Sequence, residues 1–263
     1  MGKFKTFRLI AALACLVLTL ALTSVDPVRA APSALADKIM SAADFAAACN
    51  TNLGFTISAD TIVTGGSGTI NPYACRVHLS PDVSLTFDQV SLDSPKGSNV
   101  GLLVDGGDGS QVHIHQSTMV MDGGLFLEPG GHEPGGVDGN GALLEVSQST
   151  LRSTYASGEV RLLASSCTDG GSVRVTQSEV SAPSAVYISA GLTDPAQGCP
   201  GSNGMVQVSQ SAITASLPQG LILILTGKGG QTSALQNTFA AGTGIAGGVS
   251  CKALYNIPDT PCS

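Results

Sequence analysis

The chain repeats a short alternation of apolar and polar residues about every 30 positions, and each copy ends at a glutamine. In Val206-Gln207-Val208-Ser209-Gln210, for example, apolar residues stand four and two positions before the glutamine. Alternation with a period of two predicts a β-strand that buries one face. The six glutamines are Gln89, Gln116, Gln148, Gln177, Gln210 and Gln236, spaced 27, 32, 29, 33 and 26 residues apart. A period in this range is typical of solenoid proteins.

Each copy also contains two later apolar segments, which predict two more strands. The first is marked by one apolar residue three positions after the glutamine: Leu92, Met119, Leu151, Val180, Ile213 and Phe239. The second is an apolar run that follows it: Leu102-Leu103-Val104, Leu125-Phe126-Leu127, residues 160–163, Val186-Tyr187-Ile188 and residues 221–225. Three short strands per repeat, each paired with its equivalent about 4.8 Å away in the next coil, predict a parallel β-helix.

The repeated glutamines stand at an even offset from the buried residues, so the alternation predicts that they point inward at a bend. Stacked amides can hydrogen-bond to one another along the axis, as side-chain ladders do in stacked sheets. Burying amides is costly unless they satisfy one another. We therefore expect a buried glutamine ladder, and a row of ligand-binding amides is the alternative.

Residues 1–30 have the features of a secretory signal peptide. Three basic residues precede an apolar run over residues 9–22, and Val28-Arg29-Ala30 resembles a small-residue cleavage site. The run is too short for a membrane anchor, and no later stretch is long and apolar enough to span a bilayer. The mature chain is expected to begin at Ala31 and to be exported to the periplasm or the extracellular space.

Residues 31–54 are expected to form a helical cap over the first coil. Ser41-Ala42-Ala43-Asp44 has the spacing of a capping box, so a short helix should start there. An open end would expose apolar core and unpaired strand edges, which favours a plug over the alternative of a partner-binding helix. We assign residues 55–250 to the β-helix and residues 251–263 to a C-terminal tail closed by a disulfide.

Six cysteines follow the signal peptide, and an even number in an exported chain indicates three disulfides. Cys167 and Cys199 stand ten and eleven residues before the glutamines of their copies, so they occupy nearly equivalent places in successive coils. Stacked neighbours are close enough to bridge. The expected pairs are Cys49–Cys75, Cys167–Cys199 and Cys251–Cys262. Zinc binding is the alternative, but the chain contains no C-x-x-C pair.

Composition narrows the range of partners. The chain from Ala31 onward has 8 Lys and Arg against 18 Asp and Glu, a net charge of −10. A chain this acidic repels nucleic acid and anionic membrane surfaces, so neither is an expected partner. Acidity also disfavours a strongly anionic polysaccharide. A polysaccharide or another cell-surface component is the partner class that we consider. Sugars usually bind on exposed aromatic rings, but tryptophan is absent. Four other aromatic residues are expected to be buried: Phe87, Phe126, Tyr187 and Phe239.

These features resemble the right-handed parallel β-helix superfamily that includes the pectate lyases and polygalacturonases. The resemblance covers residues ~55–250 and depends on coil length, the register of three strands and the stacked polar ladder. It implies an all-β fold, a single-stranded right-handed parallel β-helix, with the short helix as its N-terminal cap. A fold of this kind does not imply an activity.

One outward face of the predicted β-helix gathers acid–base side chains. Three positions before the glutamines stand His113, Glu145 and Arg174, and one position before them stand Asp88 and His115. A carboxylate between an imidazole and a guanidinium could act as an acid or base, because its neighbours hold it ionised and histidine titrates near neutrality. The alternative, which we favour, is a charge ladder that only supports adjacent strands.

Enzyme motifs of the superfamily are matched only in part. The resemblance to polygalacturonases implies an Asn-Thr-Asp triplet, and Asn237-Thr238-Phe239 lacks its aspartate. An Asp-Asp pair, a His-Gly pair and an Arg-Ile-Lys triplet are absent from the sequence. The resemblance to pectate lyases implies clustered carboxylates for calcium and an arginine base, a pattern that Asp88, Glu145 and Arg174 match only in part.

The most polar loop, residues 128–138, contains Glu-Pro-Gly-Gly twice with a histidine between the copies. Together with the loop of the preceding coil, it offers five carboxylates: Asp105, Asp108, Glu128, Glu133 and Asp138. Carboxylate oxygens are ligands that calcium prefers. Calcium is therefore the one cofactor that we consider, although an ordinary solvated loop is the favoured interpretation.

The sequence favours an exported, non-enzymatic β-helix that presents a binding or structural surface at the cell exterior. The alternative is a polysaccharide lyase or glycoside hydrolase of pectin-lyase-like fold. That enzyme would use the face of His113, Glu145 and Arg174.

Overall fold

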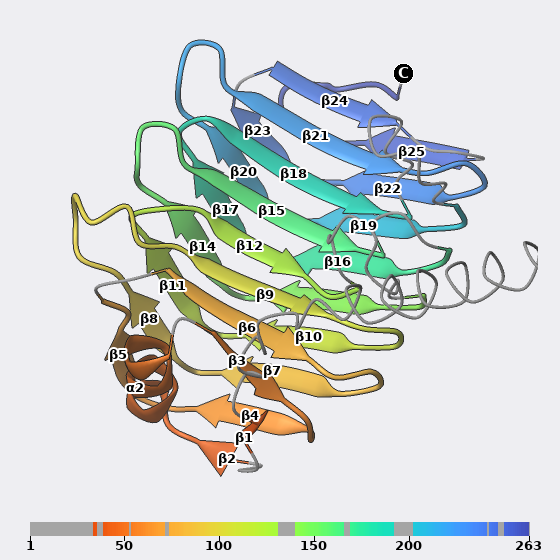
Figure 1. Cartoon of the computed structure of the whole chain (residues 1–263). Coiled ribbons are helices and arrows are strands. Elements are labelled where there is room, and N and C mark those ends of the chain that lie inside the picture. Colours follow the sequence, from red (N-terminus) through yellow and green to blue (C-terminus); the bar gives the residue numbers. More distant parts are fainter. Residues whose placement is uncertain are drawn as a thin grey trace, which may run out of the picture. The chain divides into compact units, whose positions relative to one another are not determined.

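The computed structural model describes residues 34–35, 39–52, 54–71, 74–130, 140–165, 169–191, 202–240, 242–246 and 250–262. Their strands pair in parallel and form three sheets, which we name A, B and C (Figure 1). The chain is therefore an all-β parallel β-helix with a short helix, α2 (Ala42–Thr51).

Successive strands enter sheets A, B and C in turn. Sheet A has nine strands: β1 (Ala34–Leu35), β3 (Gly54–Ile57), β6 (Cys75–Leu79), β9 (Leu102–Gly106), β12 (Leu125–Glu128), β15 (Glu159–Ala164), β18 (Ala185–Ala190), β21 (Leu221–Thr226) and β24 (Gly242–Ala246). Sheet B has nine: β2 (Ile39–Met40), β4 (Thr61–Thr64), β7 (Ser84–Asp88), β10 (Gln111–His115), β13 (Leu143–Ser147), β16 (Ser172–Thr176), β19 (Met205–Ser209), β22 (Gln231–Leu235) and β25 (Ser250–Leu254). Sheet C has seven: β5 (Ser67–Thr69), β8 (Ser91–Asp93), β11 (Thr118–Met121), β14 (Thr150–Ser153), β17 (Glu179–Ala182), β20 (Ala212–Ala215) and β23 (Thr238–Ala240).

The core is built from the inward residues of every coil. In β16, Val173 and Val175 are buried, whereas Arg174 between them is exposed. Parallel pairing places Val175 between Val146 and Val208, its equivalents in the two neighbouring coils. Apolar residues thus stack on their counterparts, which confirms the inward columns that the alternation predicts.

A tight bend at each repeated glutamine joins sheet B to sheet C. All six glutamines have a left-handed backbone, with φ between 46° and 58°. Their side chains are exposed, so the expectation that they point inward is wrong. The left-handed residue breaks the alternation of the strand: the glutamine and the residue before it both face outward. The residue after the glutamine then turns inward.

The amide ladder is nevertheless present, on the outside of the β-helix. In each step the Nε2 atom of one glutamine donates to the Oε1 atom of the next, over 3.0 to 3.4 Å. The ladder runs without a break through Gln89, Gln116, Gln148, Gln177, Gln210 and Gln236. These bonds restrict exposed side chains that would otherwise sample many rotamers.

A second ladder lies inside the same bend. The residues that follow the glutamines are buried: Ser117, Ser149, Ser178, Ser211 and Asn237. Ser149 shows the pattern, because its Oγ atom donates to the Ser147 carbonyl at 2.7 Å and accepts from the Ser117 N–H at 3.0 Å. Each side chain therefore satisfies a backbone amide of the neighbouring coil that would otherwise be buried without a partner.

Helix α2 covers the N-terminal end of sheet C. The Ser41 hydroxyl accepts from the Asp44 N–H and the Asp44 carboxylate accepts from the Ser41 N–H, so the expected capping box is confirmed. Buried Phe45 meets the ring of Phe87 edge-on, with 5.1 Å between ring centroids. The helix lies against β5, the end strand of sheet C. Gly68 of β5 permits this approach, because a side chain there would collide with the backbone of α2.

The described residues before α2, at 34–35 and 39–40, are strand rather than helix. Strands β1 and β2 pair with β3 and β4, and so extend sheets A and B beyond the point where we expected the β-helix to start. At the other end, β25 continues sheet B to Leu254. Helix α2 therefore replaces the third strand of an otherwise ordinary first coil.

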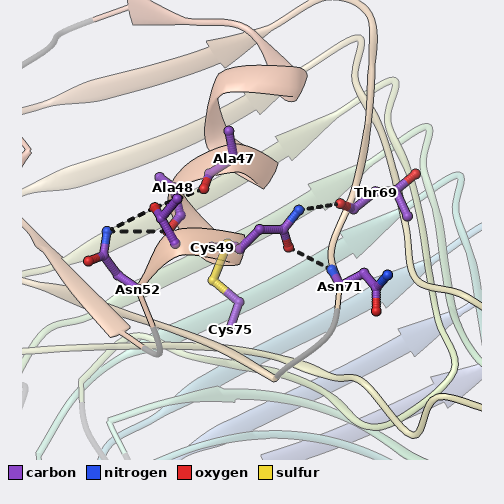
Figure 2. The surroundings of a disulfide bond; sticks show 9 residues. Ala47, Ala48, Cys49, Asn52, Thr69, Asn71 and Cys75 are labelled. Atoms are coloured by element: carbon purple, nitrogen blue, oxygen red, sulfur yellow. Dashed lines mark hydrogen bonds between the residues drawn. A yellow bond between two sulfur atoms is a disulfide. The ribbon is translucent and has the colours of Figure 1, made fainter.

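A disulfide between Cys49 and Cys75 joins the last turn of α2 to β6 (Figure 2). Next to it, the Asn50 side chain donates to the Thr69 carbonyl at 2.9 Å and accepts from the Asn71 N–H at 2.6 Å. The helix is therefore joined to the end of β5 and the residues that follow it, as well as to β6.

A second disulfide, Cys251–Cys262, joins β25 to the C-terminal segment. These two pairs match the expected pairing. Cys167, Cys199 and the predicted signal peptide lie outside the described residues. In the part of the chain that the structure describes, no helix has both the length and the apolar character to cross a membrane.

Candidate functional site

The outer face of sheet B carries the predicted acid–base column. Strand register places His113 beside Glu145, and Glu145 beside Arg174. The Nδ1 atom of His113 lies 3.1 Å from Glu145 Oε2, and an Arg174 Nη atom donates to Glu145 Oε1 at 2.8 Å. The three side chains are partly exposed, at 28%, 34% and 46%. The carboxylate thus has one partner at each oxygen.

A second outward column of sheet B contains the other two candidates. Asp88, His115 and Ser147 are register partners on β7, β10 and β13. The Nδ1 atom of His115 lies 2.9 Å from Ser147 Oγ. His115 therefore contacts the serine of the following coil, and its imidazole is tied to the strand beside it.

Basic and acidic side chains alternate along this face on three adjacent strands. Each oxygen of Glu145 has a basic partner on a neighbouring strand, which is the arrangement of a charge ladder. Glycosidases place two carboxyl groups about 5–9.5 Å apart. Asp88 lies two strands away from Glu145 and two residues further along, which puts the two backbones roughly 12 Å apart.

The described calcium candidates are used within the fold. Arg76 contacts the Asp105 carboxylate through Nε at 2.8 Å and through Nη at 2.7 Å. His78 Nδ1 lies 2.6 Å from the other oxygen of Asp105. Asp108 accepts from the Asn140 N–H at 2.8 Å, which links two loops.

Glu128 is buried beside Asp105 on the neighbouring strand. Glu133 and Asp138 lie outside the described residues. Among the residues that the structure describes, no group of three or more His, Cys, Asp or Glu side chains is placed to hold a metal ion.

A surface that the sequence did not predict lies on the outer face of sheet A. Its strands β9, β12, β15, β18 and β21 run side by side (Figure 1). One outward residue of each strand is partly exposed, and register stacks these residues along the axis. We name this column the sheet A stripe: Leu103, Phe126, Arg161, Tyr187 and Leu223.

Arg161 is held at the centre of the stripe. Its guanidinium carbon lies 5.0 Å from the ring centroid of Phe126 and 5.6 Å from that of Tyr187. Its Nε and Nη atoms donate to Glu159 Oε2 at 2.9 Å and 2.7 Å. Stacking against aromatic rings and an ion pair within the strand both favour this position of the arginine.

The expectation that Phe126 and Tyr187 are buried is wrong, because both side chains face outward and are partly exposed. Leu125 and Leu127, on either side of Phe126, are the buried residues. The unbroken apolar run hid this orientation, because a run without alternation indicates a strand that is covered on both faces. Alternation with the buried leucines on either side is the signal that places Phe126 outside.

A third surface adjoins the glutamine ladder, where the structure has a shallow, open hollow of about 560 Å³. Its lining carries no ionisable side chain: Gln177, Gln210, Ser211, Ala212, Gln236 and Thr238. Ala212 occupies the outward position that Glu179 and Thr238 hold in the neighbouring coils. The small side chain at this position leaves room beside the amides.

Comparisons of this chain with protein-family models, with curated proteins and with solved structures found no match. Function is therefore inferred from the geometry of the outer faces.

Proposed function

We propose that this protein is an exported, non-enzymatic β-helix that binds a cell-surface polysaccharide along the sheet A stripe. One observation carries the proposal: an apolar ladder is partly exposed on the outside of the β-helix. Phe126, Arg161 and Tyr187 form its centre in three successive coils. Contiguous apolar patches on a protein surface mark interaction sites.

The side chain at the centre of the stripe, Arg161, is pre-organised for binding. Aromatic residues and arginine are the side chains that most often dominate binding energy. Arg161 is already fixed by Glu159 and by two rings, so it loses little freedom when a ligand arrives. Its guanidinium edge and the Tyr187 hydroxyl can then offer hydrogen bonds between apolar neighbours.

The length and charge of the stripe favour an extended, weakly charged polymer. Four steps of about 4.8 Å separate Leu103 from Leu223, which gives a surface roughly 19 Å long. A polysaccharide combines apolar ring faces with hydroxyl groups and can follow such a line. The chain from Ala31 has a net charge of −10, which opposes the binding of a dense polyanion.

The charge ladder of sheet B is consistent with a protein that does not catalyse a reaction. Glu145 is engaged at both oxygens by His113 and Arg174. Such pairs support neighbouring strands without needing a substrate.

The proposal is tested by cosedimentation of the secreted protein with insoluble cellulose, chitin and a crude cell-wall polysaccharide. We expect Tyr187→Ser and Phe126→Ser to weaken binding by about tenfold or more, the equivalent of about 1.4 kcal/mol. Tyr155→Ser is the matched control, because Tyr155 is 40% exposed and lies outside the stripe. Undiminished binding by the Phe126→Ser/Tyr187→Ser double variant would refute the role of the stripe.

The second candidate is a polysaccharide lyase or glycoside hydrolase of the pectin-lyase-like superfamily. The convergence of His113 and Arg174 on Glu145 favours it, because this is the face on which the sequence placed acid–base chemistry. Release of reducing ends or of unsaturated sugars in the same incubations would support the enzyme.

A further inference from the structure

We propose that the hollow beside the glutamine ladder is a second binding site, which takes an uncharged saccharide segment lying along the axis of the β-helix. The site is separate from the sheet A stripe. The inference depends on the proposed function only for the class of ligand.

The amides of the ladder have hydrogen-bonding capacity left over. A glutamine side chain offers two N–H donors and two oxygen lone pairs. Gln210 donates once to Gln236 and accepts once from Gln177. Within the described part of the chain, one donor and one acceptor of Gln210 therefore remain for a ligand. A sugar hydroxyl also donates and accepts, so the two groups are complementary.

The ladder also holds these amides in place before a ligand arrives. An exposed glutamine normally loses rotamer freedom when it binds, and that loss weakens binding. Gln177 donates to Gln210 at 3.2 Å and accepts from Gln148 at 3.3 Å. The amide of Gln177 is thus held by a bond at its nitrogen and another at its oxygen, as is that of Gln210. Both residues line the hollow.

The surroundings select an uncharged and elongated ligand. The hollow has no ionisable lining residue, and Glu179 lies next to Ala212 on the adjacent strand. An anionic sugar would therefore meet a negative charge, and no cationic side chain among the described lining residues would compensate it. The amides of Gln177, Gln210 and Gln236 span two coil steps, roughly 10 Å, which suits a short oligosaccharide segment better than a single sugar.

The experiment follows the side-chain NH₂ resonances of the secreted protein by NMR during titration with cellohexaose, chitohexaose or hexagalacturonate. We expect at least one of the two neutral hexamers to shift the resonances of Gln177, Gln210 and Gln236 saturably. Filling the hollow with Ala212→Met should weaken this binding about tenfold or more. Thr118→Met is the matched control, because Thr118 is exposed in the same outward column of sheet C.

Two results would overturn the inference: no saturable shift with either neutral hexamer, or equal binding by wild type and Ala212→Met. Hexagalacturonate that binds as tightly as the neutral sugars would overturn the choice of an uncharged ligand. Cosedimentation of the Phe126→Ser/Tyr187→Ser variant distinguishes the two proposals. If this variant loses polysaccharide binding and no neutral hexamer shifts the glutamine resonances, only the second site is refuted. If the variant binds polysaccharide as the wild type does and a neutral hexamer shifts those resonances, only the role of the stripe is refuted.

Discussion

Gln116 donates through Nε2 to the Oε1 atom of Gln148 over 3.0 Å, and both residues hold a left-handed backbone, with φ of 46° and 50°. Residues other than glycine, asparagine and aspartate rarely adopt this conformation, because the Cβ atom crowds the backbone. The amide ladder is one interaction that offsets this cost. It holds the bend from outside, as the serine ladder does from inside.

Breaking the outer ladder should destabilise the fold. Gln148→Leu removes two amide hydrogen bonds and keeps the left-handed bend. We expect the free energy of unfolding to fall by about 1–2 kcal/mol, because each net hydrogen bond contributes roughly 0.5–1.5 kcal/mol. Urea denaturation measures this change. Gln207→Leu is the control, since Gln207 is an exposed strand residue outside the ladder, and an equal loss in both variants would contradict the stabilising role.

Breaking the inner ladder should have a larger effect. Ser149→Ala leaves the buried N–H of Ser117 without its partner, at a cost of about 1–3 kcal/mol. Ser91→Ala, at an exposed position of sheet C, should change stability by less than about 0.5 kcal/mol. Chemical denaturation of both variants compares the two positions. Unchanged stability of Ser149→Ala would show that the hydroxyl is dispensable at the bend.

Much of the fold could be predicted because it depends on short-range periodicity. The alternation around Val175 fixed which strand residues are buried, and the Ser41-to-Asp44 spacing located the start of α2. The direction of Gln148 could not be read in the same way. Side chains alternate between the two faces of a strand only while the backbone stays extended. A single left-handed residue interrupts this alternation and changes the face on which the following side chains lie.

The prediction that Phe126 is buried was wrong for a different reason. Phe126 is flanked by buried leucines, and hydrophobicity alone does not separate an inward leucine from an outward phenylalanine. Strict alternation would have placed Phe126 outside. The register of the acid–base column, in contrast, followed directly from the repeat, because Glu145 and Arg174 stand at the same offset from their glutamines.

Acid should loosen the N-terminal cap. Hydrogen bonds from the Ser41 side chain and backbone lower the pKa of Asp44 below its ordinary value of 3.8. A carboxyl with a lowered folded pKa stabilises the fold above its unfolded pKa, and this contribution disappears as the pH falls through the folded value. Protection of the α2 amides from hydrogen exchange should therefore drop below about pH 4.

Ser41→Ala is the matched variant for this effect. It removes the hydroxyl that caps the helix and should lower stability by about 1 kcal/mol at neutral pH. Its α2 protection should then change less on acidification than that of the wild type. An equal acid-induced drop in both proteins would assign the pH dependence to another group.

The third disulfide remains a prediction from repeat register. Peptide mapping without reduction should recover Cys167 joined to Cys199, together with Cys49–Cys75 and Cys251–Cys262. Cys167 precedes Gln177, and Cys199 precedes Gln210, by nearly the same number of residues. These two glutamines stack in adjacent coils. Recovery of Cys167 joined to any other cysteine would contradict that register.

Glu145→Gln separates the two candidate functions, because glutamine keeps the size of the side chain and removes its negative charge. If the column is a charge ladder, only a partly exposed ion pair is lost, which is worth roughly 0–1 kcal/mol. Binding of polysaccharide at the sheet A stripe should then be unchanged. If Glu145 is a general acid or base, turnover should fall by roughly 10²–10⁴-fold while the fold stays intact.

The measurement is product release from acidic and neutral polysaccharides, with and without added calcium, by wild type and Glu145→Gln. Gln207→Ala is the control, because Gln207 is the uncharged neighbour of Arg174 in the same column. Turnover that is present in wild type, kept by Gln207→Ala and lost in Glu145→Gln would overturn the binding function in favour of the enzyme. Equal stability of the three proteins, with no product from any of them, would leave Glu145 as a structural link between His113 and Arg174.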